Sequence, residues 1–227
     1  MNSRRAMTWV KICGTTSLAD AQMSVAAGAD ALGFIFATSP RRIDAEAAAE
    51  IVKAVSGEVE TIGVFVNESP STIAEIVRQV GLSGVQLHGD ETAQQLTEFR
   101  RELGQTKIIK ALSVNDLRQD NDLILEKYLG ARSSLDAMLL DSGSAGRRGG
   151  TGAPFDWESA QPTASRIREQ MPLIIAGGLN PGNVSQALDL FQPWGIDVVS
   201  GVESAPGKKD EGKLRDFMAA VRQHIVQ

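Results

Sequence analysis

The stretch GADALGFIF, residues 28–36, contains the pattern that indicates the fold of this chain. A glycine precedes a short turn, and an uninterrupted apolar run follows. This order is typical of a helix that ends and leads into a buried parallel strand. The same order recurs in GLSGVQL (81–87) and GIDVVSG (195–201). The recurrence indicates a repeated module of one strand and one helix.

Apolar runs of this kind alternate with helix-like segments along the whole chain. The predicted strands are 9–13, 31–36, 61–66, 84–88, 107–112, 137–141, 173–177 and 196–200. The predicted helices are 17–27, 44–55, 70–80, 91–103, 115–129, 156–170, 180–191 and 210–226. Eight such units predict an α/β fold, a single-domain (β/α)8 barrel. A doubly wound open sheet is the alternative, but it usually has about five to seven strands.

Residues that typically begin or end helices support these boundaries. Four helix starts are predicted, at Ser17, at Asp44, at Ser69-Pro70 and at Asn180-Pro181, where a side-chain cap or a proline in the first turn is favourable. Glycines are expected to end the helices that precede strands, namely Gly28, Gly81, Gly104, Gly130 and Gly195. Residues 1–8 are expected to be an N-terminal extension, and residues 9–227 the barrel domain.

Composition limits the classes of function. The chain has 227 residues, a net charge of -5 and a single cysteine. The acidic balance argues against nucleic acid as a partner. No apolar run is long enough for a signal-peptide core or a membrane span, so no membrane partner is expected. A lone thiol fits a reducing compartment, which predicts a cytoplasmic protein.

Polar residue types gather where the predicted strands end. In a (β/α)8 barrel the active site lies at this end of the strands. The residues placed there are Cys13, Gln86, His88, Asp141, Gly177, Gly178, Ser200 and Gly201, with Arg41 in the loop after the second strand. The two glycine-containing loops after strands seven and eight predict a phosphate site, although glycines also make tight turns without binding anything.

The remaining residue types each allow two interpretations. Cys13 is either a general base or a small buried residue, with Lys11 on the same side of the strand. Asp141 is either a general acid or base, or a helix cap. Arg41 either binds a carboxylate or phosphate, or is a solvated charge. His88 and Asp141 are too few ligands to indicate a metal site, so no metal is expected.

Eight motifs in register resemble those of the phosphoribosylanthranilate isomerase family of tryptophan biosynthesis. They run from about residue 9 to residue 210: KICG (11–14), GFIF with SPRRI (33–43), GVFVN (63–67), QLHG (86–89), LLD (139–141), GGTG with FDW (149–157), AGGLNPGNV (176–184) and SGVESAPGKKD (200–210).

The resemblance implies an aldose–ketose isomerase, an intramolecular oxidoreductase that works without metal or cofactor. Its reaction would be the Amadori rearrangement of N-(5′-phosphoribosyl)anthranilate to 1-(o-carboxyphenylamino)-1-deoxyribulose 5-phosphate. It also implies that Cys13 is the general base, that Asp141 is the general acid and that Arg41 holds the anthranilate carboxylate. The phosphate would bind at Gly177, Gly178, Ser200 and Gly201, and Gln86 and His88 would contact the substrate.

Three further expectations concern partners and rivals. A small phosphorylated molecule is the expected partner, and the protein is expected to be a monomer. The loop GSAGRRGGTG (143–152), which contains Arg147 and Arg148, is expected to be a mobile lid or a disordered surface loop. The rival functions are an epimerase, which needs several metal ligands, a histidine-pathway isomerase, which needs Asp where Cys13 stands, and a barrel that binds phosphorylated ligands without catalysis.

Overall fold

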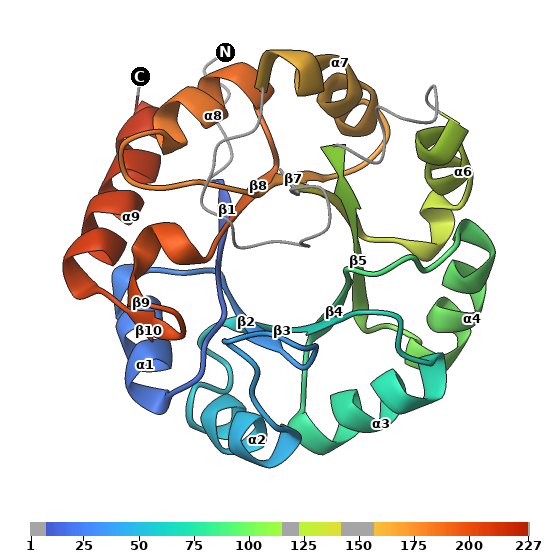
Figure 1. Cartoon of the computed structure of the whole chain (residues 1–227), viewed down its shortest axis with the longest axis horizontal. Helices are drawn as coiled ribbons and strands as arrows, with labels where there is room; N and C mark the ends of the chain where they lie inside the picture. Colours follow the sequence, from blue (N-terminus) through green and yellow to red (C-terminus); the bar gives the residue numbers. More distant parts are fainter. Residues whose placement is uncertain (1–7, 115–122, 142–156, 227) are drawn as a thin grey trace.

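Eight parallel strands close into a barrel, and helices surround it (Figure 1). The computed structural model describes residues 8–114, 123–141 and 157–226. The barrel strands are β1 (Trp9–Cys13), β2 (Ala31–Ile35), β3 (Glu60–Phe65), β4 (Gly84–Leu87), β5 (Lys107–Ser113), β6 (Ala137–Asp141), β7 (Leu173–Ile175) and β8 (Gly195–Val198). They follow one another in sequence order, and β8 pairs with β1. This closing pair confirms the predicted barrel and excludes the open sheet.

The helices lie close to the predicted segments. They are α1 (Leu18–Ala27), α2 (Ala45–Ala54), α3 (Pro70–Val80), α4 (Ala93–Leu103), α6 (Leu123–Gly130), α7 (Trp157–Arg168), α8 (Val184–Phe191) and α9 (Glu211–Val226). The predicted caps of α1 and α3 are confirmed, because the side chains of Ser17 and Ser69 accept hydrogen bonds from backbone N–H groups at Asp20 and Thr72.

Two predicted helix boundaries are wrong, the start at Asn180 and the end at Gly195. Helix α8 begins at Val184 and not near Asn180, because Asn180 accepts a hydrogen bond from the Gly182 N–H and makes a local turn. The left-handed residue that ends α8 is Gln192, with φ 44°, whereas Gly195 already belongs to β8. Gly130 ends α6 as predicted, although its φ is not positive.

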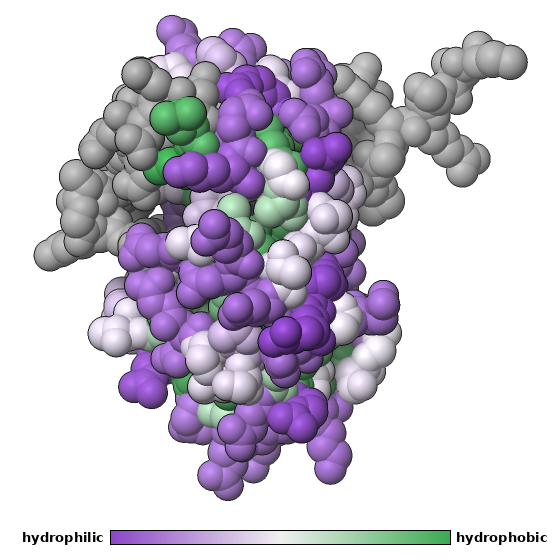
Figure 2. Space-filling model, turned by 90° about the vertical axis from the view of Figure 1, so that its right-hand side faces the viewer, coloured by the Kyte–Doolittle hydropathy of each residue, from purple (hydrophilic) through white to green (hydrophobic). Residues whose placement is uncertain are grey.

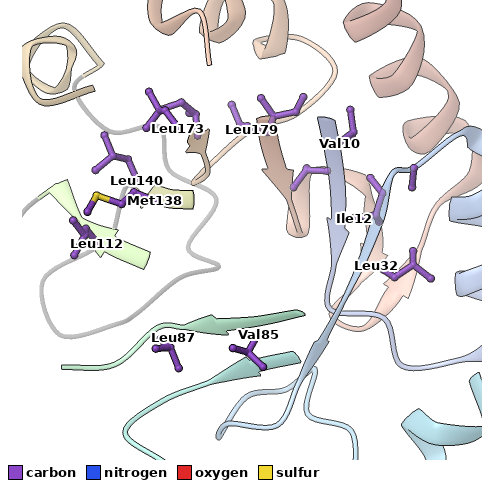
Figure 3. Packing of buried hydrophobic residues seen from close by; sticks show 14 of the residues in the cluster. Val10, Ile12, Leu32, Val85, Leu87, Leu112, Met138, Leu140, Leu173 and Leu179 are labelled. Carbon is purple, nitrogen blue, oxygen red and sulfur yellow. The ribbon is translucent and has the colours of Figure 1, made fainter. Parts of the chain in front are cut away.

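The core has two layers, because successive side chains of each strand point to opposite faces of the sheet. Val10, Ile12 and Leu32 belong to the larger cluster, which fills the space between the strands and the helices (Figure 3). A smaller cluster fills the barrel itself and consists of Trp9, Ala31, Ile62, Ile109, Ala111, Ala137, Leu139, Ile174 and Ala176. On β1 the interior face therefore carries Trp9, then Lys11, then Cys13.

A small hairpin follows the last barrel strand and was not expected from the sequence. After the short 3₁₀ helix η2 (Ser200–Val202), strands β9 (Glu203–Ala205) and β10 (Lys208–Lys209) pair in antiparallel fashion. Thr16, in the loop after β1, donates a hydrogen bond to the Gly207 carbonyl in this hairpin. The hairpin is thus tied to the loop that follows β1.

The face shown in Figure 2 is mainly hydrophilic, with scattered apolar residues. Among the described residues, none of the helices combines the length and the apolarity needed to cross a bilayer. The expected lid with Arg147 and Arg148, the expected extension up to residue 7 and residues 115–122 of the predicted helix 115–129 lie outside the described residues.

Candidate active site

The predicted site residues lie at the ends of their strands, as the barrel topology requires. Cys13 is the last residue of β1, and Asp141 is the last residue of β6. Gln86 lies in β4, and His88 follows that strand directly. Because all eight strands are parallel, these side chains belong to one rim of the barrel.

Cys13 is buried against the neighbouring strand. Its exposed fraction is 3%, and it is paired with Gly33 of β2 in the sheet register. A Cβ atom on Gly33 would lie 2.4 Å from the Cys13 Sγ atom. The missing side chain of Gly33 therefore provides the space that the thiol occupies.

Two lysines lie close to Cys13. Lys11, two residues earlier on the same face, donates hydrogen bonds of 2.7 Å to Asp197 Oδ2 and of 2.7 Å to Gln86 Oε1. Lys209 of the hairpin donates to the Cys13 carbonyl. Both lysine side chains are buried, so water screens their charges only weakly.

Burial shifts the pKa values of Cys13 and Lys11 in opposite directions. Burial raises the pKa of the Cys13 thiol, and the Asp197 carboxylate adds to this rise. The ammonium groups of Lys11 and Lys209 oppose it but do not reverse it. Burial lowers the pKa of Lys11, but the charges of Asp197 and Cys13 and the hydrogen bonds to both residues together outweigh burial, so the Lys11 pKa lies above its ordinary value. Lys11 is therefore an ammonium ion, and the raised pKa of Cys13 favours its protonated thiol.

Asp141 contacts His88 on the other side of the barrel interior. The His88 Nε2 atom lies 3.4 Å from Asp141 Oδ2, an ion-pair distance slightly longer than an ordinary N–H···O hydrogen bond. The other ring nitrogen, Nδ1, lies 2.8 Å from Gln86 Nε2. The structure thus brings three predicted site residues into one connected group.

Arg41 is buried and makes an ion pair with the hairpin. Its Nε atom lies 2.9 and 3.0 Å from the two Glu203 carboxylate oxygens, and its Nη2 atom lies 2.7 Å from Oε2. The Arg41 side chain also packs against Gly14, where a Cβ atom would lie 2.8 Å from the Arg41 Cδ atom. Arg41 therefore lies beside the end of β1, although its guanidinium already has a carboxylate partner.

Glu203 is held in its ionised form. Burial raises the pKa of its carboxyl, but the hydrogen bonds from Arg41 and the charge of Lys209 outweigh burial, and the pKa lies below its ordinary value. Lys209 itself has a pKa below its ordinary value, because burial outweighs the attraction of Glu203 and Cys13.

The two glycine-containing loops meet each other. A Cβ atom on Gly201 would lie 1.9 Å from the Leu179 carbonyl oxygen, so only glycine allows the loops after β7 and β8 to approach this closely. Gly177 and Gly178 have φ values of 92° and 68°, which also favour glycine. Ser200 and Gly201 lie in η2.

Sequence reasoning missed the partners of the predicted residues. Asp197, Glu203 and Lys209 are charged, buried and paired with the site. A signal existed for the last two, because both lie in the motif SGVESAPGKKD (200–210). Within the described part of the chain, no group of three or more His, Cys, Asp or Glu side chains is arranged to hold a metal ion.

Comparisons with known proteins agree with this geometry. The family model described as "N-(5'phosphoribosyl)anthranilate (PRA) isomerase" matches residues 10–220. The N-(5'-phosphoribosyl)anthranilate isomerase of Desulforudis audaxviator is 42% identical over 219 residues, covering 96% of this chain and 100% of that protein. The protein of the same name from Syntrophus aciditrophicus is 44% identical over 220 residues, covering 96% and 89%.

Solved structures are similar over the same length. The phosphoribosyl anthranilate isomerase of Thermotoga maritima superposes with a TM-score of 0.82 at 38% identity, covering 96% of this chain and 100% of that chain. A phosphoribosyl anthranilate isomerase in complex with reduced 1-(o-carboxyphenylamino)-1-deoxyribulose 5-phosphate superposes with a TM-score of 0.78 at 38% identity, with the same coverage.

Proposed function

This chain belongs to the N-(5′-phosphoribosyl)anthranilate isomerase family, and we propose that Cys13 and Asp141 act as the base and the acid of its reaction. The substrate is N-(5′-phosphoribosyl)anthranilate and the product is 1-(o-carboxyphenylamino)-1-deoxyribulose 5-phosphate, in tryptophan biosynthesis. The observation that carries the assignment is the position of a buried thiol and a buried carboxyl at one rim. They lie on β1 and β6, which are not neighbours in the barrel.

The residues fit the chemistry of an Amadori rearrangement. Asp141 in its protonated form donates a proton to the ring oxygen of the ribose, and the C1′–O bond breaks. The nitrogen lone pair forms the C1′=N bond of a Schiff base, which acidifies the C2′ hydrogen. Cys13 as a thiolate removes that hydrogen, and the electron pair moves to give an enolamine. Proton transfer from the C2′ hydroxyl to C1′ gives the ketone, so C2′ is oxidised and C1′ is reduced.

The surroundings of Cys13 support its role as a base. The ammonium groups of Lys11 and Lys209 stabilise the negative charge of a Cys13 thiolate. Burial raises the pKa of the thiol, which makes the thiolate a stronger base and also reduces the fraction of Cys13 that is ionised. The substrate's own nitrogen accepts the electrons, so the proposal needs no metal and no cofactor.

The other site residues are proposed to bind the substrate. The phosphate binds to the backbone of the two touching loops, at Gly177, Gly178, Ser200 and Gly201. Arg41 binds the anthranilate carboxylate through Nη1, the terminal nitrogen that does not bond to Glu203. The monomeric state and the cytoplasmic location stay predictions.

The decisive experiment measures turnover of freshly prepared N-(5′-phosphoribosyl)anthranilate by its fluorescence, with a chelator present. We expect turnover in the chelator and a loss of kcat of roughly 10²–10⁴-fold in Cys13→Ser and in Asp141→Asn, because each removes one proton-transfer group. Circular dichroism of both variants checks that they are folded. Turnover that needs added metal, or near-normal kcat in either variant, would contradict the proposal. Binding of the substrate without turnover would favour the non-catalytic barrel.

A further inference from the structure

Five polar side chains form a continuous chain through the barrel interior. Asp197 of β8 accepts a hydrogen bond from Lys11 of β1, and Lys11 also donates to Gln86 of β4. Gln86 contacts His88, which contacts Asp141 of β6. The proposed reaction gives a role in proton transfer to Asp141 and a role beside the Cys13 thiolate to Lys11, so Gln86 and His88, which connect the two, need an explanation of their own.

Donor and acceptor chemistry fixes the direction of this chain of contacts. The Lys11 ammonium only donates, so the Gln86 atom 2.7 Å from it must be the carbonyl oxygen Oε1. The amide group of Gln86 then turns its NH₂ toward His88 Nδ1 at 2.8 Å. An NH₂ group also only donates, so His88 Nδ1 must accept with its lone pair. The ring hydrogen of a neutral His88 is therefore on Nε2, the atom that faces Asp141 Oδ2.

Burial and charge make this arrangement hard to invert. Lys11, Gln86 and Asp197 have exposed fractions of 0%, 2% and 5%. Turning the Gln86 amide would place its NH₂ group, which only donates, against a buried ammonium and would remove one of the two acceptors of Lys11, which costs free energy. Asp197 holds Lys11 in place with a hydrogen bond of 2.7 Å. The orientation of Gln86 is thus imposed by the ion pair behind it.

We propose that Gln86 is a positioning residue that holds His88 in the Nε2–H tautomer, so that His88 donates to Asp141 Oδ2 and directs the acid proton of Asp141 to Oδ1. The proposal rests on the proposed function, since it concerns the acid of that reaction. With Nδ1–H instead, His88 would present a lone pair to Asp141. A protonated Asp141 would then donate its proton to the imidazole and not to the ring oxygen of the substrate.

The tautomer can be read directly by ¹⁵N NMR of the full chain labelled at histidine. The sequence has two histidines, and the other one, His224, pairs with Asp189 at the end of α9, away from the site. His224→Gln therefore assigns the spectrum. We expect the His88 Nδ1 signal at the position of an unprotonated nitrogen and the Nε2 signal at that of a protonated one. The reverse pattern in the wild-type protein would overturn the proposal.

Gln86→Glu tests the consequence for catalysis. A carboxylate at this position accepts from Lys11 and from an N–H at Nδ1, so the His88 Nδ1 signal should move to the protonated position. We expect kcat to fall by about tenfold or more, a part of the roughly 10²–10⁴-fold effect of a positioned acid, with a much smaller change in KM. The matched control is Gln192→Glu, because Gln192 accepts from Arg168 on the surface.

Each outcome separates the proposal from its alternatives. A protonated Nδ1 with unchanged kcat would overturn the positioning role. A rise in KM with kcat unchanged would also overturn it and assign Gln86 to substrate binding. An unprotonated Nδ1 in a wild-type protein without turnover would support the tautomer assignment and overturn the proposed function, because the NMR signal does not depend on turnover.

Discussion

Cys13 lies where the interior face of β1 meets the charged side chains of the rim. Its own strand places Lys11 beside it, and the later part of the chain supplies Asp197 and Lys209. The thiol is therefore buried and at the same time close to three charged groups. This combination decides the protonation of the thiol.

The Cys13 thiol should ionise at a higher pH in the folded protein than in the unfolded chain, because burial raises its pKa. The chain has one cysteine, so the ultraviolet absorbance of the thiolate reports this residue alone, with Cys13→Ser as the blank. Lys209→Met should move the titration further upward, because it removes an ammonium group. A folded-state titration below that of the urea-unfolded chain would contradict the prediction.

The candidate residues were predictable from the sequence, but their partners were not. Cys13 and Asp141 end apolar strands, and the topology of a barrel brings all strand ends together. These partners are far away along the chain: Lys209 is 196 positions from Cys13, and Glu203 is 162 positions from Arg41. No local pattern reports a pairing over that distance.

The hairpin of β9 and β10 is the element that links the rim to the last helix. Glu203 of this hairpin holds Arg41, and Lys209 binds the end of β1. Its strands are too short for any hydrophobic period, which explains why sequence reasoning did not find it. The long helices and buried strands were predictable, because periodicity, caps and glycine stops agree over many residues.

Glu203→Gln should destabilise the protein by about 3 kcal/mol at neutral pH, because it leaves the buried Arg41 charge without its partner. The Glu203 pKa is lowered, so its contribution is present above the pKa of the unfolded chain and is lost as the pH falls through the folded-state pKa. The difference between variant and wild type in urea unfolding should therefore shrink on acidification.

Glu126→Gln is the control for this measurement. Glu126 pairs with Arg166, and its side chain is 60% exposed, so the loss should stay within about 1 kcal/mol. Equal destabilisation by the two variants, or a gap that widens in acid, would contradict the role given to Glu203.

The barrel as a whole closes through a seam between β1 and β8. The Lys11–Asp197 ion pair crosses this seam inside the barrel. The count of eight strand–helix units made closure predictable from the sequence. The polar layer within the barrel was not predictable, because the sequence does not show which interior positions face each other across the axis.

Asp197→Asn should lower the free energy of unfolding by about 3–5 kcal/mol, because the fully buried Lys11 ammonium loses its counter-charge. Urea unfolding at neutral pH measures the change. Asp189→Asn is the control, since Asp189 pairs with His224 and its side chain is 75% exposed. A loss no larger than that of the control would show that the seam does not depend on this ion pair.

The pairing of β1 with β8 also has a consequence for folding during translation. Cys13 leaves the exit tunnel before Asp197 and Lys209, which come later in the chain, and domains fold as their segments emerge. A nascent chain that ends before β8 holds the thiol and the Asp141 carboxyl without the ion pair that organises the interior. Such a chain should be inactive, and translation arrested before and after β8 should separate inactive from active nascent enzyme.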